Sequence, residues 1–99
     1  MIIASGFIWH SFLKQDPNAI VLCVRSKEES DAMLRFGAIE APLSDEIEFN
    51  HYLDHFDRAK HYYIYSKTGV KGELACRLME EAGFSETINL DGGLNNFRF

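Results

Sequence analysis

The sequence predicts a three-layer α/β fold, with a central, mostly parallel five-stranded sheet and helices on both faces. Short apolar runs alternate along the chain with stretches of helical periodicity. Strands separated by helices are joined as parallel neighbours through right-handed crossovers, because a hairpin cannot connect a parallel pair. The length of 99 residues suits a single domain, residues 1–99, with one packed core.

Five apolar runs are expected to form the strands. The run "AIVLCV" is continuously apolar, which is typical of a strand buried on both faces of a parallel sheet. The run "GAIEAPL" is ended by Pro42, because proline interrupts strand pairing. In chain order, the expected strands are residues 1–3, 19–24, 37–43, 61–65 and 86–90.

Helical stretches fill the intervals between these runs. Ser5 is expected to cap a short first helix. The apolar side of that helix carries Phe7, Ile8, Phe12 and Leu13. The acidic pair at 45–46 favours a helix N-terminus before Ile47. The other expected helices are residues 27–35, residues 71–82 and a final turn at 92–97.

Charge and composition exclude several classes of partner. The formal charge of −5 opposes attraction to nucleic acids or anionic membranes, and the ten Lys and Arg residues are scattered rather than striped. No run approaches the ~20 apolar residues of a membrane span. We therefore expect neither a nucleic acid nor a membrane as partner.

The cysteines and the N-terminus indicate a reducing cytoplasm. Cys23 and Cys76 lie inside apolar elements without CxxC or His-adjacent spacing, so neither a disulfide framework nor a zinc site is expected. The first residues lack a basic region and their apolar run is interrupted, unlike a signal peptide. We expect no metal and no cofactor.

The segment "SKTGVK" is the candidate site, because it follows the expected strand 61–65 and opens the expected helix 71–82. Ligands of parallel sheets bind outside the carboxyl ends of the strands. Consecutive N–H groups in a glycine-containing turn at a helix N-terminus form a nest for anions, and two lysines flank this one. The predicted anion-binding loop consists of Ser66, Lys67, Thr68, Gly69, Val70 and Lys71.

Four motifs follow one another at a recognisable spacing. They are "CVR" at 23–25 with Glu29 four residues later, "FGAIEAP" at 36–42, "SKTGVK" with a helix that ends at Gly83-Phe84, and "INLDGGLNNF" at 88–97. In this order they resemble a single-domain rhodanese, the sulfurtransferase fold, from Ile20 to Phe97. The pairing of Arg25 with Glu29 is read as structural.

The resemblance implies a chemistry that this loop lacks. Rhodaneses take a sulfane sulfur from a donor such as thiosulfate onto a loop cysteine, as a persulfide, and pass it to an acceptor. Ser66 stands at the position of that cysteine, and Lys71 stands where the family has an arginine that grips oxyanions with two bonds. Residues 33–35, "MLR", replace the family's Gly-His-Ile. Sulfur transfer through this loop is expected to be absent.

Other chemistries are less favoured. A serine nucleophile needs a base within reach, and His61 stands at the far end of the preceding strand. The loop is one residue shorter than that of the phosphatases that share the fold, and it has no thiol. Cys23, which replaces the family's Asp, is an alternative thiol, although a packed thiol is the favoured interpretation.

Two explanations of Ser66 remain open, an engineered Cys-to-Ser change and natural drift. Drift is favoured because the loop arginine and the Gly-His-Ile motif are lost as well. The expected function is that of a rhodanese-like domain without sulfurtransferase activity, acting as a binding or regulatory module. The alternative is an active, or Cys-to-Ser inactivated, thiosulfate or persulfide sulfurtransferase. The expected partners are a small anion or sulfur-carrying substrate and an unidentified protein.

Overall fold

The computed structural model describes residues 1–26, 29 and 31–97. The strands are β1 (Ile2–Ala4), β2 (Ala19–Arg25), β3 (Ile39–Pro42), β4 (His61–Tyr65) and β5 (Glu86–Leu90). The α-helices of this part of the chain are α1 (Gly6–Gln15), α2 (Glu46–Leu53) and α3 (Val70–Glu81). Two short 3₁₀ turns, η1 (Asp31–Met33) and η2 (Leu94–Asn96), complete the described elements.

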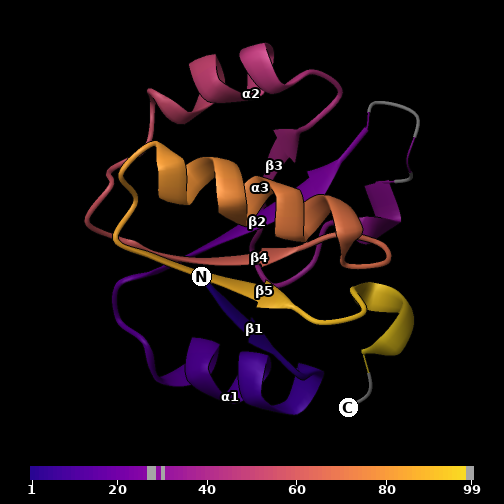
Figure 1. Ribbon diagram of the computed structural model, residues 1–99. Coiled ribbons are helices and arrows are strands. Elements are labelled where there is room, and N and C mark those ends of the chain that lie inside the picture. The colour runs from indigo at the N-terminus through magenta and orange to yellow at the C-terminus, as the bar shows by residue number, and fades with distance from the viewer. Residues whose placement is uncertain (27–28, 30, 98–99) are drawn as a thin grey trace.

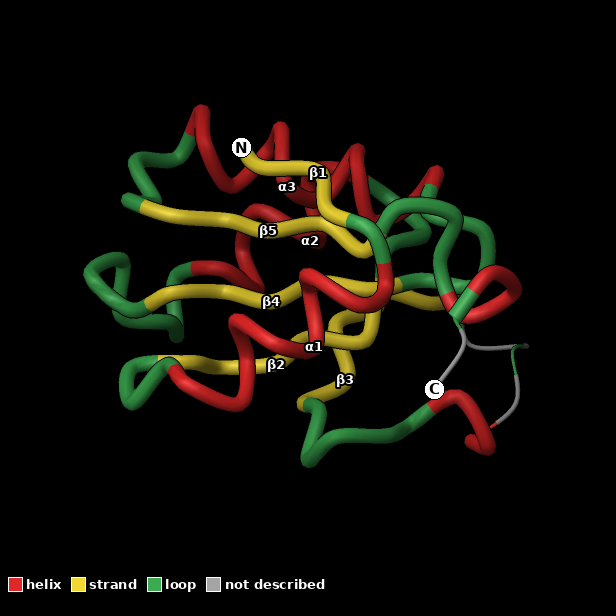
Figure 2. The backbone as a smooth tube through the Cα atoms, turned by 90° about the horizontal axis from the view of Figure 1, so that it is seen from below, coloured by secondary structure: helices red, strands yellow, loops and turns green. Residues whose placement is uncertain are grey.

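The predicted fold class is confirmed, and the sheet is parallel throughout rather than mostly parallel. Its strands lie in the order β1-β5-β4-β2-β3. Helices α2 and α3 cover one face and α1 covers the other (Figures 1 and 2). Because β5 and β2 flank β4, the segments that follow these three strands meet at one edge of the sheet.

Two apolar cores lie on opposite faces of the sheet. Side chains of β2 and β4 such as Leu22 and Ile64 pack against α2 and α3 on one face. On the other face Trp9 of α1 is fully buried among aromatic rings, and its indole Nε1 donates a hydrogen bond to the carbonyl of Ile88, 3.2 Å away. The sheet is thus fixed from both sides, which gives the loops at its edge a firm base.

The first helix buries a residue that the sequence analysis did not single out. Ser5 does cap α1, but Phe7 is 80% exposed and Phe12 is 49% exposed, while Trp9 is buried. Leu13 is half-buried and packs against the same core as Trp9, whereas Ile8 is 45% exposed. The four apolar residues noted in this short helix did not identify which of its sides faces the core.

The other helical segments have mixed outcomes. Of the predicted helix 27–35, the structure shows only the turn η1, and Leu34 and Arg35 belong to no helix. Residues 27, 28 and 30 lie outside the described residues. The helix N-terminus expected at the acidic pair 45–46 is confirmed, because Asp45 caps α2 by accepting a hydrogen bond from the N–H of Ile47. The final turn of helix is of the 3₁₀ type.

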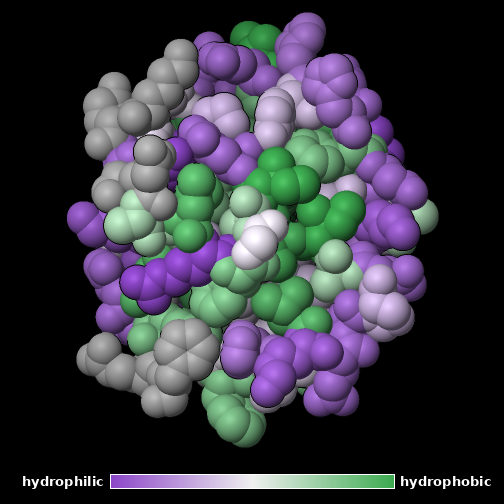
Figure 3. All heavy atoms as spheres, turned by 180° about the vertical axis from the view of Figure 1, so that it is seen from behind, coloured by the Kyte–Doolittle hydropathy of each residue, from purple (hydrophilic) through white to green (hydrophobic). Residues whose placement is uncertain are grey.

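The surface behind the view of Figure 1 has a hydrophobic centre within a hydrophilic surround (Figure 3). On edge strand β3, Ile39 is 42% exposed.

Within the described residues, none of the helices has the length and apolar character needed to cross a membrane.

Candidate functional site

Ser66 lies directly after β4, beneath the loop that leads into α3. The residue is only 2% exposed. Its hydroxyl oxygen Oγ accepts hydrogen bonds from the N–H groups of Gly69 and Gly72, at 3.0 and 3.1 Å. The loop therefore wraps around the serine side chain, at the position where the family resemblance expects a reactive sulfur.

Glycines make this tight wrapping possible. Gly69 has a left-handed backbone, φ +93°, and a Cβ there would come within 2.9 Å of the amide nitrogen of Gly92. At Gly72 a Cβ would overlap the side-chain oxygen Oδ1 of Asn89. A larger residue at either position would push the loop away from β4 or from the turn after β5.

The carbonyl groups of the loop are bound to other parts of the protein. Those of Ser66 and Lys67 accept hydrogen bonds from the N–H groups of Leu94 and Asn95, each 3.0 Å long. The carbonyl of Gly69 accepts from the N–H of Glu73 and from the side-chain amide of Asn89.

The amide groups of the loop are engaged differently. Residues 67, 68, 70 and 71 find no acceptor for their N–H groups among the described residues. These donors stand at the N-terminus of α3, where the helix dipole also favours negative charge. The loop thus has the donors that an anion requires.

Lys71 forms an ion pair across the mouth of the loop. Its Nζ lies 2.9 Å from Oε1 of Glu29, and the same carboxylate oxygen accepts from the N–H and hydroxyl of Ser26. Burial opposes ionisation of Glu29, but the bonds from Lys71 and Ser26 outweigh it, and the pKa of this carboxyl is lowered. An anion at the loop would compete with Glu29 for Lys71.

Arg25 binds the backbone of Glu29, whereas the sequence suggested a pairing between the two side chains. Its guanidinium donates to the backbone carbonyl of Glu29, at 3.0 Å, and to the carboxylate of Glu40, also at 3.0 Å. The partner of the Glu29 carboxylate is instead Lys71, 42 residues away in the sequence. Glu29 therefore connects β2 to the candidate loop.

The loop borders a hollow of about 390 Å³. The residues that line it are Glu29, Ser66, Lys67, Thr68, Val70 and Lys71. The structure thus gathers all the predicted loop residues except Gly69 around one hollow. Gly69 does not line the hollow, but its N–H group donates a hydrogen bond to the hydroxyl oxygen of Ser66.

Cys23 is paired with Tyr65 in the sheet, and its side chain lies in the core on the α1 face. It is fully buried, and its sulfur is 3.9 Å from the carbonyl oxygen of Met33. Burial raises the pKa of the Cys23 thiol, and burial also raises the pKa of Cys76 to about 12. Both sulfurs have the surroundings of packed core thiols.

The other titratable groups do not serve Ser66 either. His61 begins β4, at the opposite end from Ser66, and its Nδ1 lies 2.7 Å from the carboxylate of Asp16. Within the described ranges there is no cluster of three His, Cys, Asp or Glu residues able to hold a metal. The described part of the site therefore offers amides, the hydroxyls of Ser66 and Thr68, two lysines and the carboxylate of Glu29.

Asn89 is a site residue that the sequence analysis missed. It is 2% exposed, and its Nδ2 donates to the carbonyl of Gly69 at 3.2 Å. Its Oδ1 is buried and makes no hydrogen bond with any described residue. The available signal was an amide side chain inside the otherwise apolar end of "ETINL". Asn89 holds the loop from the neighbouring strand.

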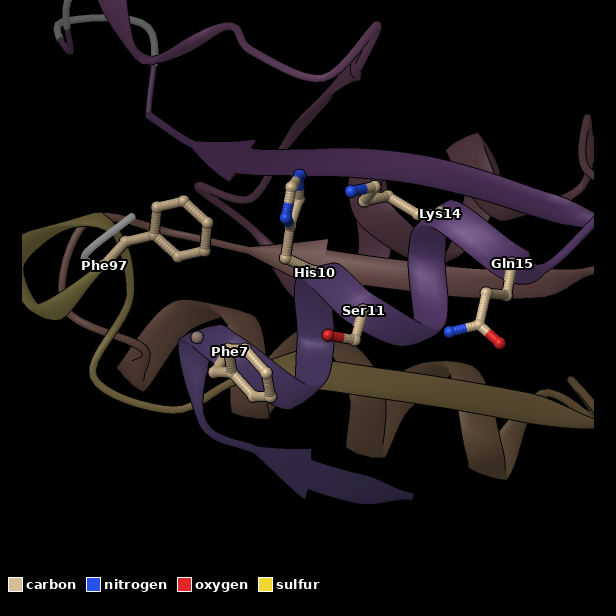
Figure 4. A pocket seen from close by; sticks show the side chains of 7 residues that line it. Phe7, His10, Ser11, Lys14, Gln15 and Phe97 are labelled. Atoms are coloured by element: carbon tan, nitrogen blue, oxygen red, sulfur yellow. The ribbon is translucent and has the colours of Figure 1, made fainter.

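A second hollow, of about 440 Å³, lies along α1 (Figure 4). Figure 4 shows that Ser11, Lys14 and Gln15 project from this helix, with Phe97 at the far end. No residue of the loop 66–71 lines it. This hollow is therefore separate from the candidate site.

Comparisons with known proteins agree with this geometry. The structure of a rhodanese-like domain protein from Staphylococcus aureus superposes with a TM-score of 0.81 at 20% identity, over 99% of this chain and 92% of that one. A polysulfide-sulfur transferase homodimer from Wolinella succinogenes gives 0.69 at 20% identity, over 97% and 72%. These likenesses show the fold.

A larger protein contains a similar unit. An NAD-dependent persulfide reductase from A. fulgidus matches with a TM-score of 0.64 at 29% identity, over 84% of this chain and 14% of that one. Among curated proteins none matches the chain. The family model described as "Rhodanese-like domain" matches residues 12–98. With the parallel sheet, the wrapped loop after β4 and this match taken together, the chain belongs to the rhodanese-like domain family.

Proposed function

We propose that this rhodanese-like domain has no sulfurtransferase activity and acts as a binding or regulatory module that holds an anionic group in the loop 66–71. The observation that carries the proposal is the hydroxyl of Ser66 at the centre of the loop amides. A serine hydroxyl is not ionised near neutral pH and cannot carry a persulfide. Sulfur transfer needs a thiolate at this position.

Anion binding depends on other atoms than the missing sulfur. The N–H groups of residues 67, 68, 70 and 71, the N-terminus of the 12-residue helix α3 and two lysine side chains all favour negative charge. Glu29 holds Lys71 in place in the absence of a ligand. The bound group is a small anion or an anionic part of a protein partner.

The alternative is an active, or Cys-to-Ser inactivated, thiosulfate or persulfide sulfurtransferase. The names of two similar structures, a polysulfide-sulfur transferase and a persulfide reductase, favour it. The burial of both cysteines of this chain opposes it, because a reactive thiol must be accessible and ionisable.

An activity assay tests the first half of the proposal. With thiosulfate and cyanide, the protein is expected to form thiocyanate no faster than a blank without protein. Clear turnover would contradict the proposal. If Cys23→Ala then abolished that turnover, the relocated thiol would be the nucleophile.

A binding titration tests the second half. Sulfate is titrated into the protein at low ionic strength, and the chemical shifts of the amide groups of residues 67–71 are followed. Lys71→Ala is expected to weaken binding about fivefold, the ~1 kcal/mol of an exposed charged contact. Arg77→Ala, which removes an exposed positive charge elsewhere on α3, is the matched control. Absent shifts, or equal losses in both variants, would contradict the proposal.

A further inference from the structure

A third hollow adjoins the loop. It measures about 480 Å³, and its lining residues are Glu29, Ala32, Met33, Arg35, Lys67, Leu94 and Asn95. Glu29 and Lys67 line this hollow and the loop hollow alike. The two hollows therefore lie side by side, with these two side chains between them, and each is far larger than a single sulfate ion.

Both walls of the third hollow are bound to the junction between β4 and the loop. On one wall, the hydroxyl of Tyr65 donates to the carbonyl of Met33 at 2.6 Å and accepts from the N–H of Arg35 at 2.8 Å. The other wall is fixed by the bonds from Leu94 and Asn95 to the carbonyls of Ser66 and Lys67. The walls of the hollow are thus bound to Tyr65, Ser66 and Lys67, and the last two belong to the anion-binding loop.

The charge of this wall differs from that of the whole chain. Arg35 and Lys67 are exposed, and neither side chain has a carboxylate partner among the described residues. The charge of Lys71, by contrast, is already balanced by Glu29. The hollow is also lined by the apolar residues Met33 and Leu94. The protein as a whole has a net charge of −5, so this hollow, with two cations that have no described carboxylate partner and with apolar lining residues, is locally positive in an acidic protein.

We infer that the ligand of the loop is an organic dianion, with one anionic group at the amides of residues 67–71 and the other at Arg35. This inference rests on the proposed anion-binding function. An apolar spacer between the two anionic groups would cross the surface of Met33 and Leu94. Hollows of these volumes are in the range of ~300–1,000 Å³ that is usual for small-molecule sites.

Ligands of graded length test the inference. Methanesulfonate, hexane-1-sulfonate and the α,ω-disulfonates of ethane, butane and hexane are titrated separately by calorimetry. The best-fitting disulfonate is expected to bind about tenfold more tightly than methanesulfonate, the gain of one further charge-assisted contact. Hexane-1-sulfonate, which has the spacer without the second charge, is expected to gain less.

Three variants locate the two ends of the ligand. Arg35→Ala is expected to remove the advantage of the disulfonate and to leave methanesulfonate binding unchanged. Lys71→Ala is expected to weaken both ligands. Arg77→Ala, on the exposed side of α3, is the control for the loss of one positive charge and should change neither.

The outcomes separate this inference from the function on which it rests. If methanesulfonate binds but no disulfonate binds more tightly, or if the advantage survives Arg35→Ala, the inference is overturned and the anion loop stands. A disulfonate that depends on Arg35 but not on Lys71 would occupy the third hollow alone, which also overturns the inference. If none of the sulfonates binds, the proposed function fails together with it.

Discussion

Two serines of this protein stand at the same kind of junction and do different things. Ser5 follows β1 and precedes α1, and Ser66 follows β4 and precedes α3. Ser5 is exposed, and its hydroxyl accepts one hydrogen bond, from the N–H of Ile8 at 3.5 Å. Ser66 is buried and accepts two shorter bonds from the N–H groups of Gly69 and Gly72.

The difference lies in the chain that follows each serine. Helix α1 begins at the next residue, so Ser5 is an ordinary N-cap. Three residues separate Ser66 from α3, and the left-handed Gly69 folds them back over the hydroxyl. A strand, a serine and a helix are therefore not enough to make a site. The loop between serine and helix places the amides around the side chain.

The largest effect is expected where another segment supports that loop. Gly93 has φ +63°, and a Cβ there would overlap the carbonyl oxygen of Ser66 and the backbone of Lys67. Gly93→Ala should lower the free energy of unfolding by more than ~3 kcal/mol, because backbone strain and overlap add. Urea denaturation measures this loss.

Gly37→Ala is the matched control for Gly93→Ala. Gly37 also has a positive φ, +70°, but a Cβ there would have nothing within 4 Å. Its replacement should cost only the ~1 kcal/mol of the strained backbone. Equal losses in the two variants would show that contact with the loop contributes nothing.

The second prediction compares the serines directly. Ser66→Ala leaves the buried N–H groups of Gly69 and Gly72 without an acceptor, so it should lower the free energy of unfolding by ~2 to 4 kcal/mol. Ser5→Ala removes one exposed cap and should cost ~0.5 to 1 kcal/mol. Both are measured by urea denaturation under the same conditions. Similar losses of stability in the two variants would show that Ser66 does no more for the fold than an ordinary helix cap such as Ser5.

The third prediction places a thiol at the centre of the loop. In Ser66→Cys, the new thiol should titrate below the ~8.5 of a free cysteine, because loop amides and the N-terminus of α3 stabilise the thiolate. It should react with iodoacetamide at neutral pH much faster than Cys23, whose pKa is raised by burial. The pH dependence of alkylation measures this pKa.

Two further variants sharpen the thiol test. Ser5→Cys, at an exposed single cap, should show a higher thiol pKa than Ser66→Cys. Sulfur transfer from thiosulfate to cyanide should return only faintly in Ser66→Cys. Adding Lys71→Arg should raise the rate, because charge-assisted hydrogen bonds from the arginine would lower the activation free energy by ~1 to 3 kcal/mol. An unreactive thiol at 66 would mean that the fold is shared with the enzymes of the family but the loop is not.

The smallest expected effect concerns the charged side chains that lie near Ser66 and have no counterpart in the segment around Ser5. The first 13 residues contain no Asp, Glu, Lys or Arg, whereas Lys71 and Glu29 form an ion pair at the mouth of the loop. The lowered pKa of Glu29 means that this pair stabilises the fold above the ordinary Glu pKa, and that the contribution is lost as pH falls through the lowered value.

Protonation of Glu29 should at the same time release Lys71 to an anion. Sulfate affinity is therefore expected to rise as pH falls through the lowered pKa, by no more than the ~1 kcal/mol of a partly exposed pair. Titrations of sulfate at several pH values measure this rise, and Glu29→Gln should bind more tightly and lose most of the pH dependence. An unchanged profile in Glu29→Gln would show that another group is responsible.

The sequence by itself determined the alternation of strands and helices and the position of the candidate loop. Both follow from local patterns: the apolar run at 61–65, the glycine at 69 and the helical period after residue 70 are all read from neighbouring residues. The order of the motifs then indicated the family, and it predicts that Ser66 stands at the position of the family's reactive residue.

Only the tertiary structure decided what surrounds that serine. Asn89 reaches Gly69 across 20 residues of sequence, Glu29 reaches Lys71 across 42, and Leu94 reaches Ser66 from the turn after β5. These contacts depend on β5 and β2 lying on either side of β4, and no local period of the sequence contains that order. The side of α1 that faces the sheet was decided in the same way: Trp9 is fully buried and bound to Ile88 of β5, 79 residues away, whereas Phe7 and Phe12 of the same helix are exposed.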